Sequence, residues 1–350
     1  MQDSPTVSTA APSSTRSGVV VVIPYYNGAK FIERSLNSVF AQTLPADEVI
    51  VVNDGSRPEE RDFLEQIAPR YAIRIIDQEN GGQGAARNTG VRESVSPYIC
   101  FLDQDDFYLP NHIKDLVAAI PADEPNFGFV YADLAEAEGD GKIVRWGMVK
   151  DHAEHPKTNL HRMLRDDLFI LPSASLFGRH AFEAVGGFDT QFMGYEDDDL
   201  SLRLFRAGFT NHFLDKPVTV WCIHTESTSF NIRMVRSRFK YFMKLVRDFP
   251  DQPRFRRFFL RECFMPRFGR YFVDHVIEAV KADDPNRAEM SSILRQYADI
   301  VLANPAVGRK QKLKLRAVVF MVENSPPGLI RAVGSFTRLP GVRNLRGLLG

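Results

Sequence analysis

The stretch YICFLDQDD, residues 98–106, places an apolar run of strand length directly before three carboxylates, Asp103, Asp105 and Asp106. An uninterrupted apolar run is typical of a strand buried on both faces. Carboxylates this close repel one another unless a cation joins them, and their hard oxygens suit Mg²⁺ or Mn²⁺, which also suit substrate phosphates. We therefore predict a divalent metal site at this strand tip. Acidic turns are also common after strands, so the neighbouring segments decide between the two interpretations.

Three more apolar, β-branched runs of strand length precede this stretch, at residues 19–23, 49–52 and 73–76. They alternate with segments of helical period, such as residues 32–40. Apolar strands that alternate with helices predict a parallel sheet covered by helices on both faces. The expected fold class is therefore α/β, with a Rossmann-like, mostly parallel sheet.

Polar residues follow each of these runs. The first run continues into PYYNG at residues 24–28, the second into NDGS at residues 53–56, and the third into Asp77 and the glycine pair at residues 81–82. Ligands of parallel sheets bind beyond the carboxyl ends of the strands. We therefore expect all four segments to face one binding rim.

Two of these segments have the chemistry of a nucleotide site. Asp54 could accept a hydrogen bond from a base N–H such as N3 of uracil, and Tyr25 or Tyr26 could supply a ring for stacking. Residues 80–90, NGGQGAARNTG, predict close backbone approach to a diphosphate, with Arg87 as its counter-charge. Ordinary interpretations, a βα turn and a glycine helix cap, stay open. The segment has neither the P-loop lysine nor GxGxxG spacing, which disfavours a dinucleotide site.

A second acidic group, GYEDDDL at residues 194–200, comes just before an apolar stretch of helical period. The helix dipole favours acids in a first turn, which gives a structural interpretation. Four adjacent carboxylates exceed what a cap requires, so one could be a general base that deprotonates a hydroxyl nucleophile. His224 follows another apolar run and could complete the metal shell, although a lone histidine is more often structural.

Composition excludes several classes of protein. The 350 residues, 44% of them apolar, suffice for a catalytic domain and a smaller region. Basic and acidic residues balance at 44 each, so no overall charge indicates nucleic acid. Cys100, Cys222 and Cys263 form no CxxC pair, which argues against a zinc cluster or disulfide framework and fits a reducing cytosol. No run approaches the ~18 apolar residues of a membrane span, and we expect no signal peptide.

The chain divides into three parts by composition. Residues 1–17 are rich in Ser, Thr, Ala and Pro, which predicts a disordered tail. Residues 18–229 carry the alternating strands and helices and all the polar motifs. Residues 230–350 are richer in Arg and Phe, with helical spacing, and we expect them to form a separate helical region.

Together these motifs resemble the inverting GT-A glycosyltransferases of family 2, over residues 18–229. Five segments are similar to the family's motifs and occur in its order, the last two corresponding to its DxD and ED motifs. They are residues 21–27, 52–56, 84–90, 101–106 and 186–197.

The resemblance implies a nucleotide-sugar donor and an Mn²⁺ or Mg²⁺ cofactor. It implies that Asp105 binds the metal, with His224 as a second ligand, and that Asp197 is the catalytic base, supported by Glu196. The implied donor site comprises Pro24, Tyr25, Tyr26, Asp54 at the base, Gly84, Arg87, Asp103 at the ribose and Gln104. Two departures matter: Tyr108 stands where tryptophan is common, and the adjacent aspartates leave Asp198 as an alternative base.

The last part of the chain is strongly basic. Apolar residues such as Leu313, Phe320 and Phe336 recur there at helical spacing, which predicts helices that lie on an anionic membrane surface. A helical bundle with a solvated basic face, or an oligomer contact, explains the same pattern. Against the single acid Glu323, the basic residues are Arg309, Lys310, Lys312, Lys314, Arg316, Arg331, Arg338, Arg343 and Arg346.

The predicted function is metal-dependent, inverting transfer of a sugar from a nucleotide donor, most simply a UDP-sugar, to a saccharide or lipid-linked saccharide in polysaccharide or envelope assembly. The expected location is cytoplasmic, with peripheral contact at the inner membrane. A sugar nucleotidyltransferase would show a Gly-rich loop with Arg and Lys after the first strand, where this chain has residues 24–27. A non-catalytic scaffold would not need Asp103, Asp105 and Asp197.

Overall fold

The apolar runs of the first hundred residues form the parallel half of one sheet. The computed structural model describes residues 16–224 and 232–324. Its first strands are β1 (Val19–Tyr25), β2 (Glu48–Asp54), β3 (Arg74–Gln78) and β4 (Tyr98–Phe101). They lie in the order β3-β2-β1-β4, and neighbours are parallel, as predicted. The strand order reverses at β1, where ligands of such sheets bind.

Helices cover both faces of this half because alternate strand residues point to opposite sides. Val19 and Val21 belong to the same apolar cluster as Ile32 and Leu36 of α1 (Ala29–Phe40). Val20 belongs to the cluster that includes α3 (Gln83–Arg92). The apolar cluster of Val19 and Val21 also includes residues of α2 (Pro58–Ile67). The short η1 (Ala68–Arg70) follows α2. All seven residues of β1 are buried, as a doubly covered strand requires.

The second half of the sheet is mixed. β8 is antiparallel to β4 and β6, β9 is parallel to β6, and β5 and β7 pair antiparallel with β9 and β6. The strands are β5 (Phe107–Tyr108), β6 (Phe127–Glu138), β7 (Ile143–Trp146), β8 (Ser175–Gly178) and β9 (Thr210–Ile223). Between them lie α4 (His112–Ala118), α5 (Leu160–Arg165), η2 (Pro172–Ala174), α6 (Arg179–Ala184) and α7 (Glu196–Arg206).

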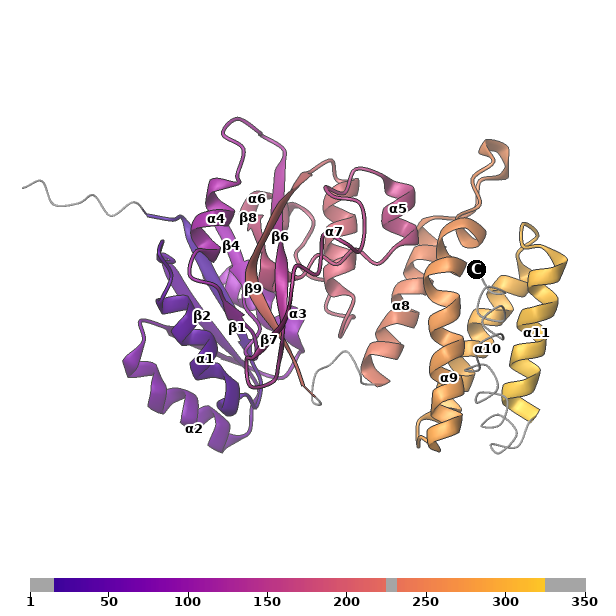
Figure 1. Cartoon of the computed structure of the whole chain (residues 1–350), viewed down its shortest axis with the longest axis horizontal. Coiled ribbons are helices and arrows are strands. Elements are labelled where there is room, and N and C mark those ends of the chain that lie inside the picture. Colours follow the sequence, from indigo (N-terminus) through magenta and orange to yellow (C-terminus); the bar gives the residue numbers. More distant parts are fainter. Residues whose placement is uncertain (1–15, 225–231, 325–350) are drawn as a thin grey trace, which may run out of the picture.

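A helical region follows, as predicted, and packs at the end of the molecule away from α1 and α2 (Figure 1). It contains α8 (Ile232–Asp248), η4 (Pro253–Phe255), the π-helix η5 (Leu260–Gly269), α9 (Arg270–Ala282), α10 (Arg287–Ala303) and α11 (Arg309–Asn324). It is not separate in its packing: one continuous apolar cluster joins Phe101 of the sheet to Phe242 and Phe272 of these helices. The two regions therefore hold each other in place.

The boundaries of the described residues bear on two predictions. Of the tail predicted over residues 1–17, residues 1–15 lie outside the described part. Ser17 belongs to the fold, since it is buried and its backbone N–H donates to Asp47 Oδ1 at 3.0 Å. The basic segment beyond Asn324 also lies outside. Among the helices of residues 16–224 and 232–324, none combines the length and apolar character needed to cross a bilayer.

Candidate active site

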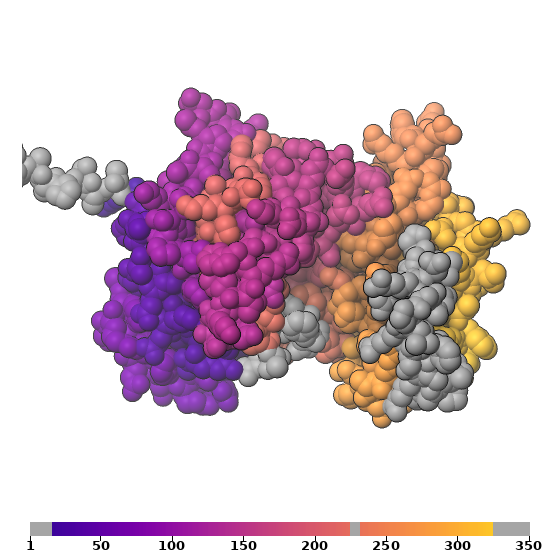
Figure 2. Space-filling view, viewed as in Figure 1, coloured from indigo at the N-terminus to yellow at the C-terminus, as the bar shows by residue number. Residues whose placement is uncertain are grey.

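A cleft of about 670 Å³ opens at the carboxyl ends of the parallel strands. Its walls come from the ends of β1 and β2, the acidic loop after β4, the start of α7, and helices α8 and α9. In Figure 2 the indigo-to-pink sheet region adjoins the orange helical region. The volume lies within the usual ~300–1,000 Å³ of small-molecule sites. The cleft therefore joins most of the predicted site residues in one place.

The loop after β1 is tied to the acidic loop after β4 by one amide. Gln104 Oε1 accepts from the Tyr26 backbone N–H at 2.9 Å, and Gln104 Nε2 donates to the Tyr26 carbonyl at 3.1 Å. Gly28 permits this approach, because a Cβ there would lie 2.2 Å from Gln104 Oε1. Gln104, Tyr26 and Pro24 all line the cleft.

The structure distinguishes the two tyrosines that the sequence left as alternatives. The Tyr25 ring is buried, and its hydroxyl donates to the Glu60 carbonyl at 2.9 Å, which leaves no face for a base. Burial, with the nearby Glu60 carboxylate, raises the Tyr25 pKa well above its usual value. Tyr26 is 47% exposed at the cleft edge. Tyr26 is therefore the ring available for stacking.

Asp54 organises the glycine turn after β3. Its Oδ1 accepts from the Gly81 N–H and its Oδ2 from the Gly82 N–H, both at 2.8 Å, and Gln78 Nε2 donates to Oδ1 at 2.7 Å. Gly82 has φ +84°, a left-handed conformation that favours glycine. A carboxylate has about four acceptor positions, so Asp54 retains capacity for a ligand N–H in the cleft.

The two other residues predicted to contact the diphosphate lie deeper. Gly84 is buried in α3, where a Cβ would meet Phe188 at 3.4 Å, and it is not among the residues that line the described cleft. Arg87 is 1% exposed, and two carboxylates occupy its guanidinium. Nη2 donates to Asp103 Oδ1 at 2.5 Å and Nη1 to Glu196 Oε1 at 3.0 Å. Arg87 thus joins the two acidic groups that the sequence singled out.

The first acidic cluster, Asp103, Asp105 and Asp106, lies in one loop whose acids have different surroundings. Asp105 Oδ2 is 2.8 Å from His224 Nε2, so the two predicted metal ligands do meet. Asp106 is buried, accepting from the Cys222 N–H at 2.9 Å and from Ser173 at 3.2 Å. Burial, together with the neighbouring aspartates, raises the pKa of Asp105 and raises that of Asp106 further.

A divalent cation fits this loop with the substrate as co-ligand. In residues 16–224 and 232–324, no group of three or more His, Cys, Asp or Glu side chains is arranged to hold a metal. Mg²⁺ and Mn²⁺ are, however, commonly bound by one or two protein ligands plus substrate phosphates. Asp105 and His224 supply such a pair. The pKa of Asp105 is raised by burial first and by the neighbouring Asp103 second, and a bound cation would offset both effects.

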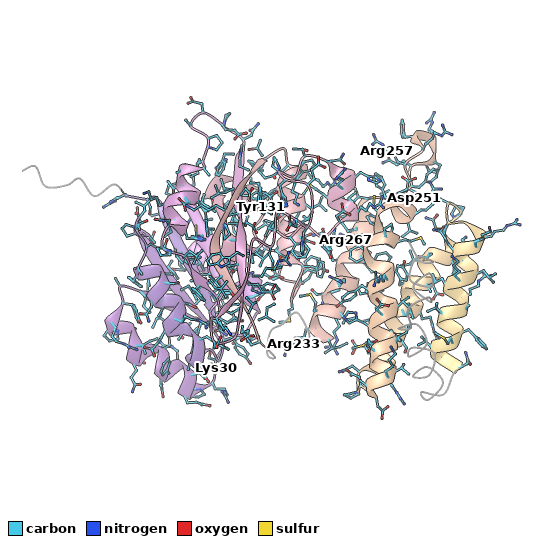
Figure 3. The ribbon with its side chains drawn as sticks, in the orientation of Figure 1. Lys30, Tyr131, Arg233, Asp251, Arg257 and Arg267 are labelled. Atoms are coloured by element: carbon cyan, nitrogen blue, oxygen red, sulfur yellow. The ribbon has the colours of Figure 1, made fainter. Side chains whose placement is uncertain are left out.

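The second acidic cluster, residues 196–199, forms the first turn of α7, as predicted. Three of its four acids have cationic partners. Glu196 pairs with Arg87, Asp198 with the buried Arg267, and Asp199 with Arg203 at 2.7 Å and Lys244 at 2.6 Å. Figure 3 labels Arg267 where the helical region meets the sheet region.

Asp197 differs from its neighbours. It lines the cleft, and no side-chain cation pairs with it among the residues that the structure describes; its Oδ1 accepts from the Asp198 N–H at 2.8 Å. Burial and the adjacent Asp198 and Glu196 raise its pKa well above the usual carboxyl range. A carboxylate that faces a cleft with a raised pKa is a candidate general base.

Sequence reasoning missed the residues that support these groups. Ser35 of α1 donates to the carbonyls of Gln104 and Asp106 at 2.7 and 2.6 Å, and Arg34 donates to that of Asp105 at 2.6 Å. It also missed the helical region's share of the cleft, Arg238 and Tyr271 among others. These residues belong to no motif, and only tertiary packing brings them to the site.

Comparison with known sequences agrees with this geometry. Residues 20–186 match the family model described as glycosyl transferase family 2. An uncharacterized glycosyltransferase of Rickettsia conorii is 31% identical over 218 residues, covering 61% of this chain and 35% of that protein. The succinoglycan biosynthesis protein ExoW of Rhizobium meliloti is 32% identical over 185 residues, covering 48% and 57%. The chain thus spans between about a third and three fifths of these relatives.

Solved structures show the same fold. S. aureus TarS 1–349 in complex with UDP-GlcNAc superposes with a TM-score of 0.59 at 17% identity, covering 91% of both chains. The mannosyltransferase PcManGT from Pyrobaculum calidifontis, in complex with GDP-Man and Mn²⁺, gives 0.54 at 19% identity, covering 97% of this chain and 86% of the other. Residues 20–186 of the chain therefore belong to glycosyltransferase family 2, and the chain has the GT-A fold.

Proposed function

We propose that this protein is an inverting, metal-dependent glycosyltransferase. The observation that carries the proposal is the placement of two groups in one cleft: the Asp105–His224 pair after β4 and β9, and Asp197 at the start of α7. The first suits a cation that binds a diphosphate, and the second suits a base that activates an acceptor hydroxyl. Asp197 is favoured over Asp198 because Arg267 engages Asp198 in a buried ion pair.

The donor we propose is a UDP-sugar. Tyr26 offers a ring at the cleft edge, and Asp54 beside it can accept a base N–H. Asp103 remains the proposed ribose contact, although Arg87 already occupies its Oδ1. Among the solved relatives, TarS is in complex with UDP-GlcNAc and PcManGT with GDP-Man, so both nucleotides deserve testing.

The chain's own residues then perform one displacement. Asp197 accepts the proton of the acceptor hydroxyl. The oxygen of that hydroxyl attacks the anomeric carbon from the face opposite the diphosphate, which inverts the configuration as the bond to the diphosphate breaks. A divalent cation bound by Asp105 and His224 would stabilise the charge that develops on the departing diphosphate. Glu196 supports the base by holding Arg87, which also fixes Asp103. No covalent intermediate is required.

We propose a saccharide or lipid-linked saccharide as the acceptor, in polysaccharide or envelope assembly. The similarity to ExoW, a succinoglycan biosynthesis protein, supports a role of this kind. The accompanying proposal for location is cytoplasmic, with peripheral contact of the basic C-terminal region at the inner membrane. In α11, Leu315 and Val322 are buried by packing within the protein, whereas Leu313 and Phe320 are about two-thirds exposed.

A transfer assay tests the proposed chemistry. The full chain would be incubated with a panel of UDP- and GDP-sugars and Mn²⁺, and release of nucleoside diphosphate would be measured, followed by NMR of the product anomer. We expect release that EDTA abolishes, and inversion at the anomeric carbon. Retained configuration, or unchanged turnover in EDTA, would contradict the mechanism.

A further inference from the structure

A short hairpin, residues 252–257, projects from the helical region between α8 and η5. Gln252 and Arg257 pair across its base, with the Gln252 N–H donating to the Arg257 carbonyl at 2.8 Å. The 3₁₀ turn η4 lies between them. Figure 1 shows this segment standing clear of the helices, and Figure 2 shows it as an orange projection.

The tip of the hairpin exposes an aromatic ring among cations. Phe255 is 70% exposed, and Arg254, Arg256 and Arg257 around it are also exposed. None of the three arginine side chains forms an ion pair or hydrogen bond within the part of the chain that the structure describes. We call these four residues the basic tip. Within the described residues, the basic tip therefore combines an exposed ring with three arginines whose charge no acid neutralises.

The basic tip is held firmly in this exposed position. At its foot, Asp251 Oδ1 accepts from the Leu260 N–H at 3.1 Å, and Oδ2 accepts from Asn304 Nδ2 at 2.8 Å. Figure 3 labels Asp251 at the foot and Arg257 farther out. Arg256 has φ +54°, a left-handed conformation that costs free energy in a residue other than glycine. The fold therefore maintains a strained turn that presents the ring outward.

More positive charge lies beside the hairpin. The Asn304–Asp251 bond, and a bond from Arg261 Nη1 to the Ala306 carbonyl at 3.3 Å, place the loop before α11 next to the hairpin foot. That loop leads directly into Arg309 and Lys310, which are both exposed. The same end of the helical region thus carries five exposed cations and one exposed ring.

We propose that the basic tip docks on an anionic lipid bilayer, with Phe255 in the interface and the three arginines on headgroup phosphates. Aromatic rings favour the boundary between headgroups and acyl chains, and arginines bind phosphate with several donors. A protein partner fits less well, because a narrow convex tip cannot supply the ~800 Å² per partner of a stable interface. The inference deepens the proposed peripheral contact and is independent of the transfer chemistry.

Vesicle sedimentation tests the proposal. The full chain would be mixed with phosphatidylcholine vesicles, with and without phosphatidylglycerol. We expect binding only to the anionic vesicles, lowered on the order of 100-fold by Arg254→Gln/Arg256→Gln/Arg257→Gln and about 10-fold by Phe255→Ala. The matched control, Arg92→Gln/Lys114→Gln/Lys142→Gln, removes the same charge from exposed positions on the sheet region and should bind nearly as well as the parent.

Three outcomes would overturn the proposal: no binding of the parent chain to anionic vesicles, equal losses in the tip and control variants, or self-association by light scattering that only the tip variants lose. Release of nucleoside diphosphate from the donor is measured in parallel. The tip variants should keep it, since the hairpin lines no part of the cleft. A failure of the membrane proposal is thereby distinguished from a failure of the proposed chemistry.

Discussion

The negative charge of the two acidic clusters in the cleft is neutralised to different extents. In the cluster of residues 196–199, the protein supplies its own cations to three of four acids and leaves Asp197 without one in the described structure. In the cluster of residues 103–106, only Asp103 is paired with an arginine, while Asp105 meets a histidine and Asp106 meets neutral donors. Among the described residues, positive charge therefore balances the cluster of residues 196–199 except at Asp197, whereas the cluster of residues 103–106 carries more acidic than basic charge.

This difference explains how one cleft could serve two chemical tasks. An acid with an arginine partner is held in place by its ion pair, even at Asp198, where burial raises the pKa to about 6 against the lowering effect of Arg267. An unpaired acid at the cleft with a raised pKa is free to exchange a proton. A cluster that lacks cations is suited to receive one with the substrate.

Asp197→Asn should lower kcat by about 10³- to 10⁴-fold, because it removes the proposed general base without changing the shape of the side chain. Because burial and adjacent acids raise the pKa of Asp197, the parent enzyme should lose activity as pH falls through that raised pKa, above the usual carboxyl range. Steady-state kinetics across pH would measure both effects. Metal-dependent UDP binding by calorimetry should persist in the variant. Turnover equal to the parent's would assign the base elsewhere.

Asp105→Asn should have the next largest effect, a loss of about 10²- to 10³-fold in kcat/KM, because it removes a charged ligand from the proposed metal site. In contrast to Asp197→Asn, it should also abolish the gain in UDP affinity that Mn²⁺ provides. Calorimetric titration of UDP with and without Mn²⁺ would separate the two variants. If Mn²⁺ strengthened UDP binding equally in both, the division between the clusters would be wrong.

Arg87→Lys tests the link between the clusters. Lysine keeps the charge but cannot donate to Asp103 and Glu196 with a planar fork, so one buried acid loses its partner. We expect kcat/KM to fall about 100-fold, and removal of the charge in Arg87→Met to cost about 3–5 kcal/mol of stability. Kinetics and thermal unfolding would measure these effects. The control is Arg92→Lys, an exposed position in the same helix, which should change neither.

Sequence patterns could predict the strand tips but not the pairing within them. The uninterrupted apolar runs indicated β1 to β4 and their parallel pairing, and the acid-rich segments indicated both clusters. His224 was indicated by its place after an apolar run. Which acid remains unpaired could not be read from EDDD, because the deciding cations, Arg267 and Lys244, come from helices far along the chain. The continuous core between sheet and helical region was missed for the same reason: its aromatic residues meet only in three dimensions.

The smallest expected effect concerns Tyr26, the proposed stacking partner of the donor's nucleobase. Tyr26→Ala should raise the KM for the nucleotide sugar by about 10-fold with little change in kcat, because ring stacking with a base contributes roughly 1–3 kcal/mol. Tyr26→Phe keeps the ring and should behave like the parent, which separates stacking from any hydroxyl contact. Tyr25→Phe should leave the KM unchanged but lower thermal stability, since the buried Tyr25 hydroxyl bonds to Glu60. An unchanged KM in Tyr26→Ala would show that the nucleobase does not stack on this ring at the cleft edge.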